Sequence, residues 1–247
     1  MLERWDYLMI DEITHCLRCQ EPLRQQLSWQ QIWSFTTIEW PSCCESCQSK
    51  FKKCATKGVC CYCQHPLIKV DETICFDCQQ WLKLYDENYL NHRSIFEYND
   101  FFKDWIRDYK YLGDIRQAQI MLPILKEYYY QYSNYTWTYL PSSPQNYKKR
   151  GFNQIQVLFE LAHIPYQELF DYNIHQPGQS QAKKNKKERL NLVQPFIINN
   201  EKIETKNILI VDDVYTTGTT LIRAKELLFQ HSIERCLSLT LARDSLI

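Results

Sequence analysis

From residue 92 onward, short hydrophobic runs of strand length alternate with longer segments whose apolar residues recur at the spacing of an amphipathic helix. Residues 208–211 are aliphatic throughout, which is typical of a strand buried on both faces of a parallel sheet. This order of elements predicts an α/β fold with an open, mainly parallel sheet covered by helices. The predicted strands are residues 94–98, 135–140, 196–198, 208–211 and 237–241, and the predicted helices are residues 101–111, 115–130, 152–162 and 221–229.

One proline inside a predicted helix and two segments between the predicted elements carry further expectations. Pro123 lies inside the second predicted helix, where it is expected to kink the chain. The polar residues from 142 to 150 predict a loop. Residues 177–187 lack hydrophobic anchors and predict a mobile loop.

The distribution of cysteine divides the chain into two parts. Eleven of the twelve cysteines lie between Cys16 and Cys78, and the remaining one is Cys236. We therefore expect a cysteine-rich head, residues 1–85, followed by the α/β domain, residues 86–247.

The head contains four pairs of cysteines separated by two residues, the spacing with which two thiolates bind one zinc ion. Two such pairs complete a closed four-sulfur site, which is structural because it leaves no position for water. Disulfides or free thiols are the alternatives, and zinc is favoured over disulfides in a reducing compartment. The predicted ligands are Cys16, Cys19, Cys44 and Cys47 for one ion, and Cys60, Cys63, Cys75 and Cys78 for the other.

Further cysteines and histidines leave the exact ligand sets open. Cys43 or Cys61 could replace a neighbouring cysteine as a ligand, and Cys54 has no partner at this spacing. His15 and His65 stand beside cysteines, but we interpret them as bystanders because sulfur ligands suffice. Since a small head buries little apolar surface, zinc would supply much of its folding free energy.

Charge and hydropathy argue against a membrane protein and against a generally basic one. Lys+Arg and Asp+Glu both number 29, so the formal net charge is zero and any basic site must be local. The longest purely aliphatic run, residues 208–211, is far shorter than the roughly 20 apolar residues that span a bilayer. Acidic residues precede any apolar stretch at the N-terminus, unlike in a secretory signal. We predict a cytoplasmic protein without membrane insertion.

The residues from 208 to 220 read ILIVDDVYTTGTT, a strand with two carboxylates at its carboxyl end, then a loop and a helix. Ligands of open α/β sheets bind at this end of the strands. The hydroxyls of Thr216, Thr217, Thr219 and Thr220, the flexible Gly218 and the helix N-terminus together suit a phosphate group. The carboxylates of Asp212 and Asp213 accept hydrogen bonds and suit a sugar diol or a developing positive charge. The segment therefore predicts a site for a phosphorylated sugar.

This segment resembles the 5-phosphoribosyl 1-diphosphate (PRPP) signature of type I phosphoribosyltransferases. The resemblance implies that Asp212 and Asp213 are the catalytic pair, which holds the ribose hydroxyls. It implies Mg²⁺ as the cofactor that accompanies PRPP. It also implies that the 5-phosphate is bound by Tyr215, Thr216, Thr217, Gly218, Thr219 and Thr220.

Residues 150–154, RGFNQ, resemble a signature of the ComF family of late-competence proteins, which also includes GntX-like proteins. The cysteine-rich head followed by residues 102–114 is similar to this family too, so the resemblance covers almost the whole chain. In the family architecture RGFNQ occupies the place of the diphosphate loop, which implies that Lys149, Arg150 and Gly151 bind diphosphate. The spacing of Gln181, Arg189, Asn191 and Phe196 also fits the family.

Two basic features near these motifs allow two interpretations each. Lys184 and Arg189, with the lysines around them, would form a flexible hood that closes over PRPP, or else a solvated loop. Lys110 and Gly113 could reach the sugar-phosphate site, but we favour the interpretation that they close a helix.

The family resemblance implies a cytoplasmic competence protein that supports natural transformation. Its expected partners are PRPP, a ComFA-type helicase and incoming single-stranded DNA. Two biochemical roles remain open at this point. The domain either transfers phosphoribosyl to an amine or a base, or is a non-catalytic module that senses PRPP or binds DNA.

Overall fold

The structure is a computed structural model that describes residues 13–23, 33, 41–69, 71–173, 194–198, 203, 205–231 and 233–244. Its elements follow one another in the order α2 (Glu45–Gln48), α3 (Phe76–Trp81), η3 (Glu87–Tyr89), β1 (His92–Glu97), α4 (Asp100–Lys110), η4 (Ile115–Ile120), α5 (Leu122–Gln131), β2 (Thr136–Tyr139), α6 (Pro144–Arg150), α7 (Gln154–Ala162), β3 (Phe170–Tyr172), β4 (Phe196–Ile198), β5 (Asn207–Tyr215), α9 (Thr219–Phe229) and β6 (Arg235–Arg243).

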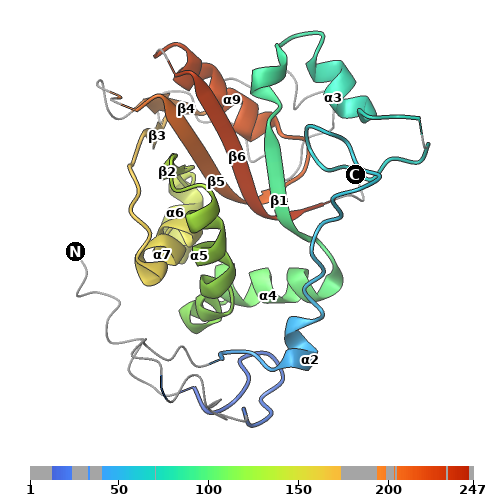
Figure 1. Cartoon of the computed structure of the whole chain (residues 1–247). Helices are drawn as coiled ribbons and strands as arrows, with labels where there is room; N and C mark the ends of the chain where they lie inside the picture. The colour runs from blue at the N-terminus through green and yellow to red at the C-terminus, as the bar shows by residue number, and fades with distance from the viewer. Residues whose placement is uncertain are drawn as a thin grey trace.

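Four parallel strands form the main sheet in the order β1-β6-β5-β2 (Figure 1). β5 lies between β6 and β2, and its residue Leu209 is opposite Leu237 on one side and Trp137 on the other. Residues 208–211 of this strand are at most 1% exposed, as expected for a central strand. The predicted α/β fold with a mainly parallel sheet is confirmed.

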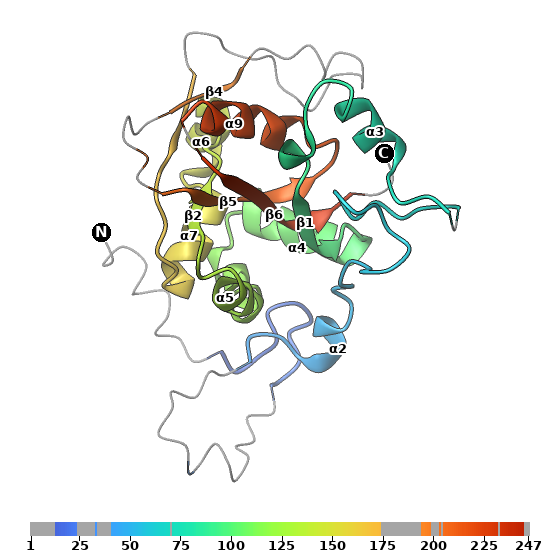
Figure 2. The same ribbon diagram turned by 45° about the horizontal axis from the view of Figure 1, so that its top comes forward.

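The two faces of the sheet pack into two separate cores, because successive residues of a strand point to opposite faces. On one face Leu209 and Val211 pack against α4, α5 and α7. On the other face Ile208 and Ile210 pack against α9 and against cysteines of the N-terminal segment. Figure 2 shows α9 on one side of the strands and α4, α5 and α7 on the other.

Two helical segments differ from the predictions. Residues 115–130 form η4 and α5 rather than one kinked helix, and Pro123 lies in the first turn of α5, where its missing N–H breaks no helical bond. The segment expected to be a polar loop contains α6. Ser143 caps this helix by accepting a hydrogen bond from the Asn146 N–H at 3.3 Å, and Pro144 favours its first turn. None of the residues of α6 is buried. Its sequence, PQNYKKR, therefore has no need of an apolar face and lacks the periodicity by which a helix is predicted.

The predicted strand at residues 196–198 exists, but it lies outside the main sheet. β4 pairs antiparallel with β3, and Asp171 is opposite Ile197. The partner of this strand is far from it in sequence, so the local pattern could not identify it.

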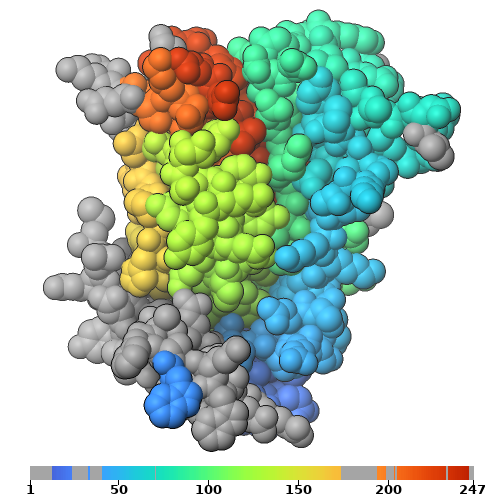
Figure 3. Space-filling model, viewed as in Figure 1, coloured from blue at the N-terminus to red at the C-terminus, as the bar shows by residue number. Residues whose placement is uncertain are grey.

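The described part of the N-terminal segment forms a band along one side of the molecule, coloured blue to teal in Figure 3. The middle of the band extends the sheet beyond β1: the N–H of Cys54 donates to the carbonyl of Ile95 at 2.9 Å, and the N–H of Glu97 donates to that of Lys52 at 2.8 Å. The cysteines that precede this stretch lie near α4, and those that follow it lie near α9.

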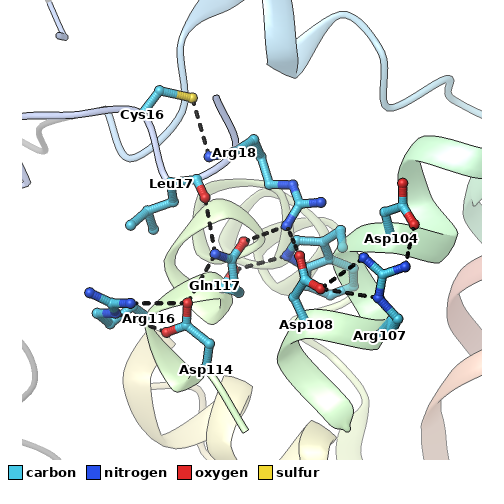
Figure 4. A network of polar contacts seen from close by, with 10 residues as sticks. Cys16, Leu17, Arg18, Asp104, Arg107, Asp108, Asp114, Arg116 and Gln117 are labelled. Atoms are coloured by element: carbon cyan, nitrogen blue, oxygen red, sulfur yellow. Dashed lines mark hydrogen bonds and ion pairs between the residues drawn. The ribbon is translucent and has the colours of Figure 1, made fainter. Parts of the chain in front are cut away.

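A polar network fixes the first end of the band to α4 and η4 (Figure 4). Arg18 donates to Asp108 at 2.7 Å and to the side chain of Gln117 at 3.1 Å. Gln117 in turn donates to the carbonyl of Leu17 at 3.1 Å. The first group of cysteines is therefore held on the face of the sheet that α4 covers.

Candidate functional site

The carboxyl end of β5 continues directly into a tight turn and then into α9. Gly218 is the N-cap of α9 and has a φ of 78°, which L side chains rarely adopt. A Cβ at this position would lie 2.8 Å from Cζ of Tyr215, so glycine is required for space as well as for conformation. The hydroxyls of Thr217 and Thr219 are 2.9 Å apart. The turn, residues 216–218, thus places threonine hydroxyls beside the N-terminus of α9, where the helix dipole favours an anion.

The two carboxylates at the end of β5 lie in different surroundings. Asp213 forms an ion pair with Lys110, and its Oδ2 accepts a hydrogen bond from Gln154 at 2.9 Å. Burial opposes ionisation of Asp213, but the charge and hydrogen bond of Lys110, the N–H of Val214 and the charge of Arg150 together outweigh it and lower the pKa of this carboxyl. Burial and the adjacent charge of Asp213 raise the pKa of Asp212 to about 7. The doublet therefore combines one carboxylate that is ionised at neutral pH with one that titrates near neutral pH.

Lys110 is the residue of this site that the favoured sequence interpretation missed. It is the last residue of α4, so it does end a helix as expected, and its ammonium group also reaches Asp213. Gly113 lies beyond the helix end with a φ of 72°. The spacing along the chain contains no signal for the ion pair, because Lys110 and Asp213 meet only through the packing of α4 on the sheet.

The RGFNQ segment reaches the same edge of the sheet from the neighbouring strand β2. Gly151 ends α6 with a φ of 81°, and Asn153 caps α7 by accepting hydrogen bonds from the N–H groups of Ile155 at 2.9 Å and Gln156 at 3.1 Å. Arg150 donates to the side chain of Gln154 at 3.0 Å, and Gln154 donates to Asp213. Arg150 is thus brought close to Asp213, Gly151 follows it at the end of α6, and Lys149 is exposed on α6.

Tyr215 supports the turn from inside the protein. Its ring is 6% exposed, stacks on His92 with a centroid distance of 4.0 Å, and lies 4.7 Å from Cζ of Arg243. Its side chain is therefore packed in the core, and its carbonyl accepts a hydrogen bond from the Asp244 N–H at 2.9 Å, so Tyr215 supports the turn and is not placed to bind the 5-phosphate with its side chain. Lys184 and Arg189 lie outside the described residues.

Two groups of four cysteines are the candidate metal centres. The sulfur atoms of Cys16, Cys19, Cys44 and Cys47, which we name the first cluster, lie within 4.8 Å of one another. The same holds for Cys60, Cys63, Cys75 and Cys78, the second cluster. Tetrahedral zinc with Zn–S bonds of about 2.3 Å separates its sulfurs by about 3.8 Å. The distances of 3.7 Å between Cys19 and Cys44 and of 3.5 Å between Cys63 and Cys75 are compatible with such a site.

The two clusters differ in exposure. All four cysteines of the second cluster are buried, whereas in the first cluster Cys19 is exposed and Cys44 is half-buried. The structure brings together the same two sets of four cysteines that the spacing predicts. Cys43, Cys54 and Cys61 stay outside them, and the His65 ring accepts a hydrogen bond from Arg243 at 3.2 Å.

Comparisons with known proteins show what the chain is similar to. Residues 156–245 match the family model of the phosphoribosyl transferase domain. Over 214 residues the chain is 33% identical to competence protein ComFC of Streptococcus pneumoniae (strain ATCC BAA-255 / R6), with 86% of this chain and 92% of that protein covered. It is 31% identical over 231 residues to competence protein ComFC of Bacillus subtilis (strain 168), with 90% and 88% covered. Among the described residues, no helix has the length and apolar character needed to cross a bilayer.

Proposed function

Because the chain belongs to the ComFC family of competence proteins and carries a phosphoribosyltransferase domain, we propose that it binds PRPP and acts in natural transformation. The observation that carries the PRPP proposal is the acidic doublet at the end of β5, followed by the Gly218 turn into α9. Carboxylates suit the ribose hydroxyls, and the turn with its helix N-terminus suits the 5-phosphate.

The strand order supports a separate place for the diphosphate. β2 pairs with β5, and the segment after β2 carries Lys149, Arg150 and Gly151. A ligand whose ribose lies over Asp212 can therefore extend its diphosphate toward these cationic groups, which form charge-assisted hydrogen bonds with phosphate oxygens.

Mg²⁺ is part of this proposal because it neutralises diphosphate charge when it is bound with PRPP. Carboxylate oxygens are suitable ligands for this cation. Asp213 is engaged by Lys110, so Asp212 is the carboxylate of the doublet that would hold the cation or the ribose.

A second candidate role is binding of PRPP without turnover, and the Lys110 ion pair favours it. In an active transferase, the carboxylates would stabilise the cationic ribosyl centre while diphosphate departs. The ammonium group of Lys110 neutralises Asp213 and weakens this stabilisation. Release of diphosphate from PRPP, assayed with bases, amines and DNA ends as acceptors, distinguishes an enzyme from a binding module.

Isothermal titration calorimetry with PRPP and Mg²⁺ tests the binding site. We expect saturable binding to the wild type and its loss in the double variant Asp212→Asn, Asp213→Asn. Asp171→Asn changes an exposed aspartate on β3 and should bind like the wild type. Failure of the wild type to bind PRPP, or unchanged binding by the double variant, would refute the proposed site.

We further propose that the protein handles incoming single-stranded DNA together with a ComFA-type helicase, in a reducing cytoplasm. The exposed Tyr147 precedes Lys148 and Lys149 in the chain, and the exposed ring of Tyr111 lies 5.3 Å from Cζ of Arg150. Aromatic rings and cations together bind single strands without sequence preference. Affinity for an oligothymidine measured at rising NaCl should fall steeply if cations contact phosphates, and a flat response would contradict this surface.

Both cysteine clusters are proposed to hold structural zinc. All twelve cysteines are free thiols in this structure, as a metal site in a reducing compartment requires. Elemental analysis of protein purified without chelator should find two zinc ions per chain.

A further inference from the structure

We propose that the second cysteine cluster positions the phosphate-binding turn, residues 216–218, through Trp81 and Arg243, and that the first cluster has no such role. This inference rests on the proposed function, because it assigns the turn to a phosphate group. It makes Trp81 and Arg243 positioning residues, which act on the ligand through the turn.

Trp81 connects one half of the second cluster to the turn. α3 has Cys75 as its N-cap, contains Cys78 and ends at Trp81. Cys78 and Trp81 are separated by about one helical turn, so the indole is fixed relative to the thiolates. Trp81 is 4% exposed, and its Nε1 donates a hydrogen bond to the carbonyl of Thr217 at 3.0 Å. The helix that supplies two of the four sulfurs is thus bonded directly to the backbone of the turn.

Arg243 connects the other half of the cluster to the same turn. Its guanidinium group donates to the carbonyl of Cys63 at 2.7 Å and lies 4.7 Å from the centroid of the Tyr215 ring. The imidazole ring of His92 also stacks on the Tyr215 ring, with a centroid distance of 4.0 Å. The ring then contacts Gly218 so closely that a Cβ there would clash with it. The position of Gly218 therefore depends on Tyr215, and Tyr215 is held by Arg243.

A metal ion at the second cluster would join these two halves. Cys60 and Cys63 lie on one segment of chain and Cys75 and Cys78 on another, and four bonds to one ion fix the distance between the segments. Without the ion, Trp81 and Arg243 are no longer held at a fixed separation. The turn between them would lose the rigid support that keeps its N–H and hydroxyl groups ready for phosphate.

The first cluster provides an internal control. It is attached to α4 and η4, by the ion pair of Arg18 with Asp108 and by the bond from Gln117 to Leu17. These elements pack on the opposite face of the sheet from α9. Loss of this cluster should leave the turn in place.

The variants Trp81→Phe and Trp105→Phe test the role of the indole. Trp105 is also buried, and its Nε1 also donates to a backbone carbonyl at 3.0 Å, but the acceptor is Gln117 of η4. Each variant loses one indole hydrogen bond. We expect Trp81→Phe to weaken binding of inorganic phosphate and of Mg-PRPP about tenfold, the value of one lost hydrogen bond. Trp105→Phe should leave both affinities unchanged. Equal losses in the two variants would overturn the proposal.

The variants Cys78→Ser and Cys47→Ser test the role of the metal. Each should lose one zinc ion by elemental analysis, and only Cys78→Ser should lose phosphate binding. Amide hydrogen exchange provides a readout that needs no ligand: exchange at residues 216–220 should accelerate in Cys78→Ser and not in Cys47→Ser. If the wild type binds no phosphate, the proposed function fails, whereas unchanged exchange in a folded Cys78→Ser variant refutes the coupling itself.

Discussion

At the scale of single residues, neighbouring carboxylates with opposite pKa shifts define the candidate site. Lys110 lowers the pKa of Asp213, while burial and the charge of Asp213 raise that of Asp212. Burial disfavours the charged form of both carboxyls, and the neighbouring groups outweigh this effect only for Asp213. Near neutral pH, Asp212 therefore gains or loses a proton while Asp213 stays ionised.

The first prediction follows from Asp212. Its pKa is about 7 in the folded protein and 3.8 in the unfolded chain, so the folded state binds the proton more tightly. The free energy of unfolding should therefore fall as pH rises from 3.8 to about 7, and level off above. Urea denaturation across this range should show the fall in the wild type and a smaller one in Asp212→Asn. Identical pH profiles would contradict the shift.

The second prediction concerns Lys110→Met, which leaves the carboxylate of Asp213 without its cation. We expect a loss of about 2 kcal/mol in the free energy of unfolding at neutral pH, between the values for exposed and buried pairs. Because folding lowers the pKa of Asp213, the ion pair stabilises the folded protein fully at pH values above 3.8, the pKa of this carboxyl in the unfolded chain. The difference from the wild type should shrink as pH falls below it. Lys103→Met, an exposed lysine of the same helix, should change stability little.

The sequence alone was enough to predict the acidic doublet, the threonines and Gly218 as site residues, because they all lie within one continuous stretch, residues 212–220. Lys110 and Gln154 could not be assigned to Asp213 in the same way. Their contacts with it span 103 and 59 residues and exist only because α4 and α7 pack on the same face of the sheet.

At the scale of elements, the unit formed by β5, the turn and α9 follows from local sequence. An aliphatic run gives the buried strand, and Gly218 allows the sharp entry into the helix. α6 was not predicted because its stability comes from a Ser143 cap and Pro144 and not from an apolar face. β4 was predicted as a strand, but its pairing with β3 depends on chain contacts that no local pattern contains.

The third prediction tests the turn with two glycines of similar conformation. Gly218 and Gly58 have φ values of 78° and 67°. A Cβ added to Gly218 would clash with the ring of Tyr215, whereas a Cβ added to Gly58 would meet no atom within 4 Å. Gly58→Ala should lose about 1–2 kcal/mol of stability from backbone strain alone. Gly218→Ala should lose more and should also lose phosphate binding, as measured by urea denaturation and calorimetry. Equal stability losses would show that Tyr215 does not constrain the turn.

At the scale of the whole molecule, the two cysteine clusters lie on opposite faces of one sheet. The sequence predicts their members, since the spacing of the pairs is local, but not their separation by the sheet. That separation arises because residues 52–54 run along the edge of β1 and carry the chain from one face to the other. The division of the chain at residue 85 and the presence of Mg²⁺ stay predictions.

The fourth prediction is that zinc leaves the two clusters at different rates. In the first cluster a chelator can reach Cys19, which is exposed, and Cys44, which is half-buried. All four cysteines of the second cluster are buried. Zinc release followed with a chromophoric chelator should show a fast phase and a slow phase of equal amplitude. Cys47→Ser should remove the fast phase and Cys78→Ser the slow one. A single phase in the wild type would show that burial does not protect the second cluster.

The pairing of β1 with β6 also bears on how the protein is made. The hydroxyls of Ser94 and Thr240 on these strands are 2.8 Å apart although 146 residues separate them. On the ribosome, β1 emerges long before the strand that it must join, and parallel pairing over such a distance is slow. The four-stranded sheet can therefore close only after β6 has left the exit tunnel, and until then the nascent chain carries β1 without its partner strand.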